Sequence, residues 1–314
     1  MLERLQSLTT TYPFYTSVVA IILAIFLFDV QGVIIKFAGQ DYAVSQIALL
    51  RNLLGIIPTW IALQLSANWR SGERSLKLKN WPLALTRGLM IAGAQLCFYF
   101  AIIKMELATA TTLAFAGPLF VTSLSIPLLG HRVGLWRTLA VIIGFAGVLL
   151  VIRPGVEDFN AYLYLPLGAA FFYALASVTS RFFESSIPTA LINIYSSIGA
   201  TVSTGIIVWL THSWRPIPLG IDWAWFGMMG FTGGCAVLLM ISAYRQTEPS
   251  SLSPFEYFGI PFSFLLGWVF FAEAPFEKIF PGVLLIVGGG LLVLWREHTI
   301  NKCSGKPPST ASGR

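Results

Sequence analysis

Residues Ser17–Ala38 read SVVAIILAIFLFDVQGVIIKFA, a run of 22 residues that contains only two charged side chains, Asp29 and Lys36. A helix needs about 20 mainly apolar residues to cross the hydrocarbon core of a bilayer. The run is too long for the apolar part of a signal peptide, and no small-residue cleavage site with a soluble body follows it. We therefore interpret it as an uncleaved first transmembrane span.

The rest of the chain has the same character. Hydrophobic residues make up 56% of the 314 residues and charged residues 11%, whereas soluble domains carry roughly 25% charged residues. The apolar runs do not alternate as barrel strands do, so their backbones must be satisfied within helices. The sequence predicts an all-α integral membrane protein with ten transmembrane helices. After the first, the spans lie near 45–66, 83–104, 107–129, 135–152, 162–182, 188–211, 223–244, 251–272 and 279–296.

The net charge of +6 is explained by the connections between the spans. With a cytoplasmic N-terminus, 14 of the 20 Lys and Arg residues lie on the cytoplasmic side and 4 on the other, while Lys36 and Arg51 lie within spans. This bias obeys the positive-inside rule. It predicts a multi-pass protein of the inner membrane with both termini cytoplasmic, and no nucleic-acid partner. The tail 301–314, rich in Ser, Pro and Gly, is predicted to be disordered.

Motifs for catalysis or metal binding are not visible in the sequence. The three cysteines show no metal-like spacing, and the three histidines lie in connections or at a span end. There is no HExxH, GxSxG or P-loop. We therefore predict no catalytic residue, no metal and no cofactor, and we predict that the protein is not an enzyme. A membrane-embedded enzyme and a non-transporting sensor or structural protein remain the alternatives.

The two halves of the chain resemble each other. A shift of 142 residues places Phe115, His131 and Gly147 on Tyr257, Glu273 and Gly289, and a shift of 145 places Lys36 on Arg181. The predicted repeats, 17–153 and 162–296, contain five spans each, so the second must enter the membrane upside down. Inverted repeats give a protein two conformations of similar energy and a site near the midplane. This favours a carrier that works by alternating access.

Motifs at the ends of both halves resemble a known family. The first half has ATATTLAFAGPLF at 108–120, LLGHRVG at 128–134 and GFAG at 144–147; the second has SPFEY at 253–257, LGW at 266–268, EAP at 273–275 and LWRE at 294–297. Together they resemble the EamA-type repeats of the drug/metabolite transporter superfamily over residues 17–297.

The resemblance implies a ten-helix bundle whose central cavity is lined by the first, third, fourth, sixth, eighth and ninth helices. It implies transport of a small organic metabolite, and SPFEY is similar to members that move riboflavin, S-adenosylmethionine or amino acids. One departure is His131, which replaces the repeat-ending Glu that the second half keeps as Glu273. The role of His131 is left open.

A charged residue inside a transmembrane span is expected to have a structural or functional role, because its insertion into the bilayer costs roughly 2.5–3.5 kcal/mol. Asp29 and Arg51 lie at similar depths, so they either form a structural ion pair or face a cavity, where Asn52 would add donors. Glu256, beside Tyr257 and five residues before Pro261, is predicted to be a cavity ligand or proton carrier, with a salt bridge as the alternative.

Other polar side chains, Tyr257 among them, complete the predicted substrate-binding and coupling site. Gln95 and Tyr99 lie one helical turn apart in the third span, and Tyr173 is in the middle of the sixth. Ordinary helix packing is an equally good interpretation of each alone. The expected partners are a small-molecule substrate, the lipid bilayer and a coupling proton or counter-substrate.

Two further groups have simpler explanations. The basic residues at span ends are predicted to snorkel to the interface: Lys36, Arg87, Lys104, Arg181 and Arg245. The glycines Gly144-x-x-Gly147 and 288–290 predict close helix packing in the fifth and tenth spans. We place those spans at the periphery, where a homodimer contact is possible.

Overall fold

The computed structural model describes residues 13–65, 69, 76, 78–129, 135–152, 161–179, 182–183, 187–218, 220–246, 252, 255–289 and 291–292. The regular structure in these residues is helical throughout. In chain order the helices are α2 (Pro13–Ala38), α3 (Val44–Leu65), α5 (Trp81–Lys104), α6 (Leu107–Ala114), α7 (Gly117–Leu129), α8 (Leu135–Ile152), α9 (Tyr164–Thr179), α10 (Thr189–Leu210), α11 (Ile221–Gln246), α13 (Gly259–Phe271) and α14 (Phe276–Ile279). A short 3₁₀ turn, Ala161–Leu163, precedes α9, and residues 282–289 are also helical.

Six of these helical segments are long and apolar enough to cross a membrane. They are α2, α3, α5, α10, α11 and the segment made by α9 with its 3₁₀ turn, and they match the predicted first, second, third, seventh, eighth and sixth spans. The remaining described helices are shorter. The protein is therefore a multi-pass, all-helical membrane protein.

The fourth and ninth predicted spans are not single helices, so those two predictions are wrong in detail. Residues 107–129 divide into α6 and α7 at Phe115 and Ala116. Pro118 has no amide hydrogen to donate within a helix, so it fits in the first turn of a new helix rather than in the interior of a continuous one. In the ninth span a turn at Tyr257 and Phe258 precedes α13.

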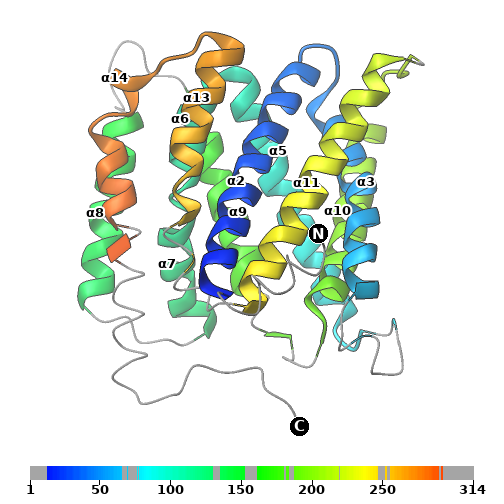
Figure 1. The fold of residues 1–314 in the computed structure, drawn as a ribbon, viewed down its shortest axis with the longest axis horizontal. Coiled ribbons are helices and arrows are strands. Elements are labelled where there is room, and N and C mark those ends of the chain that lie inside the picture. The colour runs from blue at the N-terminus through cyan, green and yellow to red at the C-terminus, as the bar shows by residue number, and fades with distance from the viewer. Residues whose placement is uncertain are drawn as a thin grey trace.

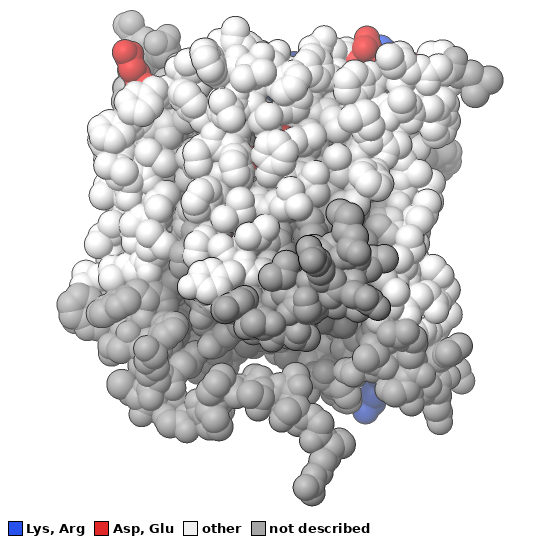
Figure 2. All heavy atoms as spheres, viewed as in Figure 1, with Lys and Arg blue, Asp and Glu red and all other residues white. Residues whose placement is uncertain are grey.

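The helices stand side by side as a bundle (Figure 1), with α3 and α10 at one edge and α8 at the other. The described middle of the face in Figure 2 is almost free of charged side chains, whereas acidic and basic groups appear at its upper rim. Many large apolar side chains are exposed, among them Ile57 at 60%, Phe231 at 70% and Val269 at 60%. Such a surface is suited to lipid rather than water.

Two of the main contacts between helices are each matched by a second contact in which both helices are replaced by their repeat counterparts. The sequence repeat pairs α2 with α9, α3 with α10 and α5 with α11. The contact of α2 with α11 is matched by that of α9 with α5, and the contact of α3 with α11 by that of α10 with α5. The paired helices α3 and α10 also contact each other. The repeat counterparts Phe115 and Tyr257 meet with ring centroids 5.2 Å apart.

Two glycines allow α5 and α10 to approach closely. A Cβ atom on Gly88 of α5 would lie 2.3 Å from the Ser196 carbonyl oxygen of α10, and one on Gly199 of α10 would lie 2.5 Å from the Leu85 carbonyl oxygen. Both distances are too short for any side chain, so this α5–α10 seam requires glycine.

The glycines predicted to mark close packing can now be placed. A Cβ atom on Gly147 of α8 would lie 2.7 Å from the Gly282 carbonyl oxygen, and one on Gly144 would lie 2.4 Å from Leu119 Cδ1. Close packing is confirmed for this pair, and α8 lies at one edge of the bundle as expected (Figure 1). At Gly288 a Cβ atom would meet no described atom within 4 Å, so close packing is not found there.

Candidate functional site

A cavity of about 700 Å³ lies inside the bundle between helices of both halves. Its walls come from α2, α3, α5, α6, α9, α10 and α11, together with residues near the start of α13. Pockets that hold small organic molecules have volumes of about 300–1,000 Å³. The cavity is therefore large enough for a metabolite, and its lining combines aromatic rings with charged and amide side chains.

Seven of the eight residues predicted for the site line this cavity: Asp29, Arg51, Asn52, Gln95, Tyr99, Tyr173 and Glu256. The eighth, Tyr257, does not belong to the lining. Its ring is buried against Phe115, and its hydroxyl oxygen finds no hydrogen-bond partner among the described residues. Tyr257 lies at the turn that interrupts the ninth predicted span, and this turn gives it a different direction from its neighbour Glu256.

Helix α5 places four of its lining residues on one face. Arg87, Ile91, Gln95 and Phe98 follow each other at intervals of four, four and three residues, which is the spacing of one helical face. Gln95 is joined to Asn52 of α3 by two reciprocal hydrogen bonds: Asn52 Nδ2 donates to Gln95 Oε1 at 2.8 Å, and Gln95 Nε2 donates to Asn52 Oδ1 at 2.9 Å. This amide pair fixes α3 against α5 at the wall of the cavity.

Arg87 was expected to snorkel to the interface, and the structure shows that this is wrong. It lies six residues after Trp81, about 9 Å into α5 at 1.5 Å per residue. Its Nε donates to the Ala176 carbonyl oxygen at 3.0 Å, and its Nη1 donates to Asn193 Oδ1 at 3.3 Å and Ser196 Oγ at 3.0 Å. The guanidinium is held inside because two neighbouring helices, α9 and α10, supply acceptors for it.

Several polar lining residues were missed by the sequence analysis. Gln31 lines the cavity and donates from Nε2 to the Met229 carbonyl oxygen at 2.9 Å. Asn193 and Ser196 line it from α10, where they also receive Arg87. Gln31 follows Asp29 by two residues within an apolar run, and that signal was present in the sequence. Asn193 could be recognised only once its contact with Arg87 was known.

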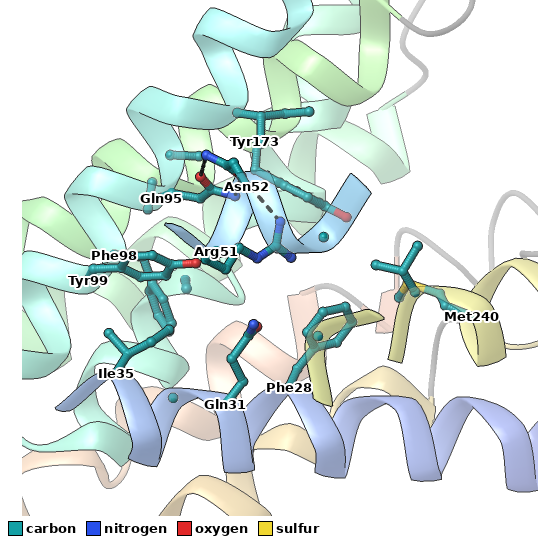
Figure 3. A pocket seen from close by; sticks show the side chains of 18 of the residues that line it. Phe28, Gln31, Ile35, Arg51, Asn52, Gln95, Phe98, Tyr99, Tyr173 and Met240 are labelled. Atoms are coloured by element: carbon teal, nitrogen blue, oxygen red, sulfur yellow. Dashed lines mark hydrogen bonds between the residues drawn. The ribbon is translucent and has the colours of Figure 1, made fainter. Parts of the chain in front are cut away.

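Asp29 and Arg51 do not form the ion pair that was one of the two interpretations. The ion pair found among the described residues joins Lys36 to Glu273 instead. Asp29 is 8% exposed, and its Oδ2 finds no hydrogen-bond partner among the described residues. Arg51 makes one long contact, from Nη1 to Asn52 Oδ1 at 3.4 Å. Figure 3 shows Arg51 extending from α3 into the cavity, toward the α2 wall that carries Gln31.

Lys36 was also expected to snorkel, and this prediction is wrong. Its Nζ forms an ion pair with Glu273 Oε1, donates to the Met105 carbonyl oxygen at 2.8 Å and lies 4.8 Å from the centroid of the Phe271 ring. Glu273 Oε2 accepts a hydrogen bond from the Leu107 amide at 3.0 Å. We call Lys36, Glu273, Met105 and Leu107 the clasp, because they join the end of α2, the α5–α6 connection and the segment after α13.

The end of α13 directs Glu273 into the clasp. Ala272 adopts a left-handed conformation with φ 55° and ψ 30°. The Ala272 amide donates to the Trp268 carbonyl oxygen and the Glu273 amide to the Gly267 carbonyl oxygen, each at 3.1 Å. This ending, in which the Ala272 amide closes the turn of an αL motif, reverses the chain immediately before Glu273.

Further contacts hold the same end of the bundle. Gln46 of α3 exchanges two hydrogen bonds with the Arg215 backbone, at 2.8 and 2.9 Å. The Tyr42 hydroxyl donates to Asp222 Oδ2 at 2.7 Å, and this hydrogen bond raises the pKa of Tyr42 to about 12. The clasp and these contacts link the α2–α3 connection to segments of the second half. The cavity lining begins beside the clasp, at Ile35, and extends toward the other end of the bundle as far as Arg87 and Met240.

Comparison with known proteins agrees with this architecture. The sequence profile of the EamA-like transporter family matches residues 15–153 and, a second time, residues 160–295. The chain belongs to the EamA-like transporter family. The two matched regions correspond closely to the two predicted repeats.

Curated relatives are transporters at low identity. The pseudopaline exporter of Pseudomonas aeruginosa is 26% identical over 284 residues, covering 89% of this chain and 94% of that protein. The S-adenosylmethionine uptake transporter of Rickettsia felis is 23% identical over 72% of this chain and 76% of that protein. The riboflavin transporter of Brucella anthropi is 26% identical over 73% of this chain and 81% of that protein. A crystal structure with 19% identity matches with a TM-score of 0.60, over 91% of this chain and 99% of that chain, which shows the fold alone.

Proposed function

We propose that the protein is a secondary transporter, not an enzyme, that moves a small organic metabolite across the cytoplasmic membrane by alternating access. The cavity carries this proposal: its volume is about 700 Å³, its lining is partly polar, and helices of both halves enclose it. A site between two halves suits a carrier because rocking one half against the other exposes it to either side in turn.

The internal repeat supports alternating access. We propose ten spans in two inverted repeats, 17–153 and 162–296. The exchange of helix contacts between the halves, the meeting of the counterparts Phe115 and Tyr257, and the twofold family match all support this arrangement. If the halves swap their conformations, the closed end becomes open and the open end becomes closed.

The orientation follows from the distribution of Lys and Arg. We propose that both termini are cytoplasmic, since this places 14 basic residues inside and 4 outside. The clasp then lies at the outer end of the bundle. The structure would correspond to a conformation closed to the outside, with the clasp as part of the closure.

The substrate-binding and coupling side chains in this proposal are Asp29, Arg51, Asn52, Gln95, Tyr99, Tyr173 and Glu256. Tyr257 becomes a supporting residue at the α13 turn. Riboflavin, S-adenosylmethionine and amino acids are the candidate substrates, because relatives that share this architecture carry the first two names. Coupling is to a proton or to a counter-substrate, and Glu256 is the proposed proton carrier.

Counterflow into proteoliposomes tests the proposal. The purified full-length protein is reconstituted with an unlabelled solute inside, and uptake of the labelled solute is measured for riboflavin, S-adenosylmethionine and mixed amino acids. We expect at least one to accumulate above protein-free liposomes, and Glu256→Gln to lose this activity between pH 5.5 and 8. Asp41→Asn, an exposed carboxylate outside the cavity, is the matched control. A membrane enzyme or sensor would show no counterflow with any solute.

Cysteine accessibility tests the orientation. In a variant without the three native cysteines, Gln40→Cys lies in the α2–α3 connection and Lys79→Cys lies just before α5. An impermeant maleimide added to intact cells is expected to label Gln40→Cys and to spare Lys79→Cys. The reverse pattern would invert the topology.

A further inference from the structure

Two charged side chains of opposite sign in the cavity lack strong partners. Asp29 is buried, and its Oδ2 finds no hydrogen-bond partner among the described residues. Among the described residues, Arg51 makes one hydrogen bond, a long one of 3.4 Å to the neutral amide oxygen of Asn52. An ionised group removed from water costs several kcal/mol unless a partner compensates it. Both groups line the cavity, so a molecule in the cavity is able to act as that partner.

Arg87, the other basic residue that lines the cavity, differs from Arg51 because the protein itself supplies its hydrogen-bond acceptors. Its guanidinium donates to Ala176, Asn193 and Ser196, so its hydrogen-bonding capacity is largely used by the protein. The amides of Asn52 and Gln95 are likewise used by each other. The contrast distinguishes Asp29 and Arg51 from Arg87 and the amide pair, because Asp29 and Arg51 keep hydrogen-bonding capacity for a ligand.

The two groups lie at similar depths. Asp29 is nine residues from the end of α2 at Ala38, and Arg51 is seven residues from the start of α3 at Val44. At 1.5 Å per residue these separations are about 13 and 10 Å from the same end of the bundle. In the view of Figure 3 the Arg51 side chain lies between Tyr99 and Phe28, and Gln31 extends from α2 on the side below it.

We propose that the cavity binds a zwitterionic organic solute, with its cationic group on Asp29 and its carboxylate on Arg51. This inference rests on the proposed transport function and narrows its substrate class. The planar fork of Arg51 suits a carboxylate, to which it can donate two parallel hydrogen bonds. Asp29 suits an ammonium or sulfonium group. A solute with only one charge leaves either Asp29 or Arg51 uncompensated in the cavity, whereas a zwitterion compensates both.

The proposed substrate class is tested by measuring how matched ligands change the melting temperature of the wild-type protein in nanodiscs. The probes are S-adenosylmethionine and the twenty protein amino acids, the N-acetyl derivative and the methyl ester of each amino acid, and riboflavin as a solute that is not zwitterionic. We expect at least one zwitterion to raise the melting temperature, since a ligand that binds the native state stabilises it. The N-acetyl derivative of an amino acid lacks the α-ammonium group and its methyl ester lacks the α-carboxylate, so each is expected to bind more weakly and to produce a smaller shift.

Failure of this inference is distinguishable from failure of the transport function. If riboflavin or a singly charged derivative stabilises the protein as well as any zwitterion does, or if no zwitterion stabilises it, the zwitterion assignment is overturned. Counterflow of riboflavin into proteoliposomes made from the same purified protein would then preserve the transport function. Absence of both binding and counterflow for every probe would overturn both.

Variants of Asp29 and Arg51 test which residue binds which charged group of the zwitterion. Asp29→Asn is expected to weaken the zwitterion about tenfold to a hundredfold, the loss of one charge-assisted hydrogen bond, but not its N-acetyl derivative. Arg51→Gln is expected to weaken the zwitterion similarly, but not the methyl ester. Asp41→Asn and Lys104→Gln, two exposed positions, are the matched controls. If Asp29→Asn keeps full affinity and alters only the pH dependence of transport, Asp29 is a proton site and the assignment is wrong.

Discussion

Helix α2 carries two charged side chains seven residues apart, Asp29 and Lys36, and they differ in how completely the protein pairs them. Lys36 is held by Glu273, by the Met105 carbonyl oxygen and by an aromatic ring. Asp29 is equally buried, yet its Oδ2 finds no hydrogen-bond partner among the described residues. Fully paired charges fix one arrangement of the helices around them. An incompletely paired charge costs stability, so it indicates a site kept ready for another molecule. We therefore expect the clasp to have a structural role and the cavity to be the functional site.

The largest expected effect comes from breaking the clasp. Lys36→Met leaves Glu273 without its cation and is expected to lower the free energy of unfolding by about 3 kcal/mol, the lower end for a broken buried pair, because the two side chains remain 10% and 19% exposed. Denaturant unfolding in detergent micelles measures this. Asp29→Asn, on the same helix, is expected to cause no loss of stability.

A double variant sharpens this prediction. Lys36→Met with Glu273→Leu removes both charges and is expected to be more stable than either single variant, because no unpaired buried charge remains. Lys104→Met, at an exposed position near the same end, is the control. Additive losses in the double variant would mean that Lys36 and Glu273 act independently, and the clasp would not be a unit.

The wall of the cavity is expected to be the next most sensitive region. Gly88→Ala puts a Cβ atom 2.3 Å from the Ser196 carbonyl oxygen, so α5 and α10 must separate beside the Arg87 contacts. Overpacking of this kind costs about 1–3 kcal/mol. Gly227→Ala in α11 has no described atom within 4 Å and serves as the control. Equal stability of the two variants would show that the α5–α10 seam is looser than described.

A smaller effect, a gain in stability, is expected from a substitution at Ala272, where the chain reverses before Glu273. Ala272 has φ 55°, a left-handed conformation that costs an L-residue roughly 1–2 kcal/mol and glycine almost nothing. Ala272→Gly is therefore expected to raise the free energy of unfolding by about 1 kcal/mol. An unchanged or lower melting temperature would show that flexibility gained in the unfolded chain outweighs the relief of strain.

The smallest effect concerns Tyr42, which is half-buried at the clasp end. Its pKa is raised to about 12, because the neutral hydroxyl donates to Asp222. The stabilisation is complete below the ordinary tyrosine pKa near 10 and is lost as the pH rises from there through 12. The ultraviolet absorbance of phenolate, measured as wild type minus Tyr42→Phe, follows this titration. Asp222→Asn is expected to bring the midpoint back toward 10, and a midpoint already near 10 in the wild type would contradict the hydrogen bond.

Polar residues inside apolar runs were the part of the site that the sequence could predict. Asp29, Arg51, Gln95 and Glu256 all line the cavity, since a polar side chain in a membrane helix avoids lipid and turns toward other polar groups. The same logic applied to Gln31 would have found it. The general architecture could also be predicted, because the high share of apolar residues and the low share of charged residues indicated a helical membrane protein.

Residues whose position depends on distant partners could not be predicted. Lys36 and Arg87 look like interfacial residues from their place near span ends, and only acceptors far along the chain, Glu273 and Asn193, draw them inside. The side on which Tyr257 faces depends on a turn that the run of apolar residues concealed. Sequence position gave the depth of these side chains but not their direction.

The clasp also has a consequence for biosynthesis. Glu273 is 237 residues beyond Lys36, so a ribosome that adds roughly 5–20 residues per second completes the pair on the order of ten to fifty seconds after Lys36 is made. During that interval the first span must reside in the membrane with its ammonium group at the interface. Insertion of α2 therefore cannot depend on Glu273, and the ion pair is a late event that locks helices already in place.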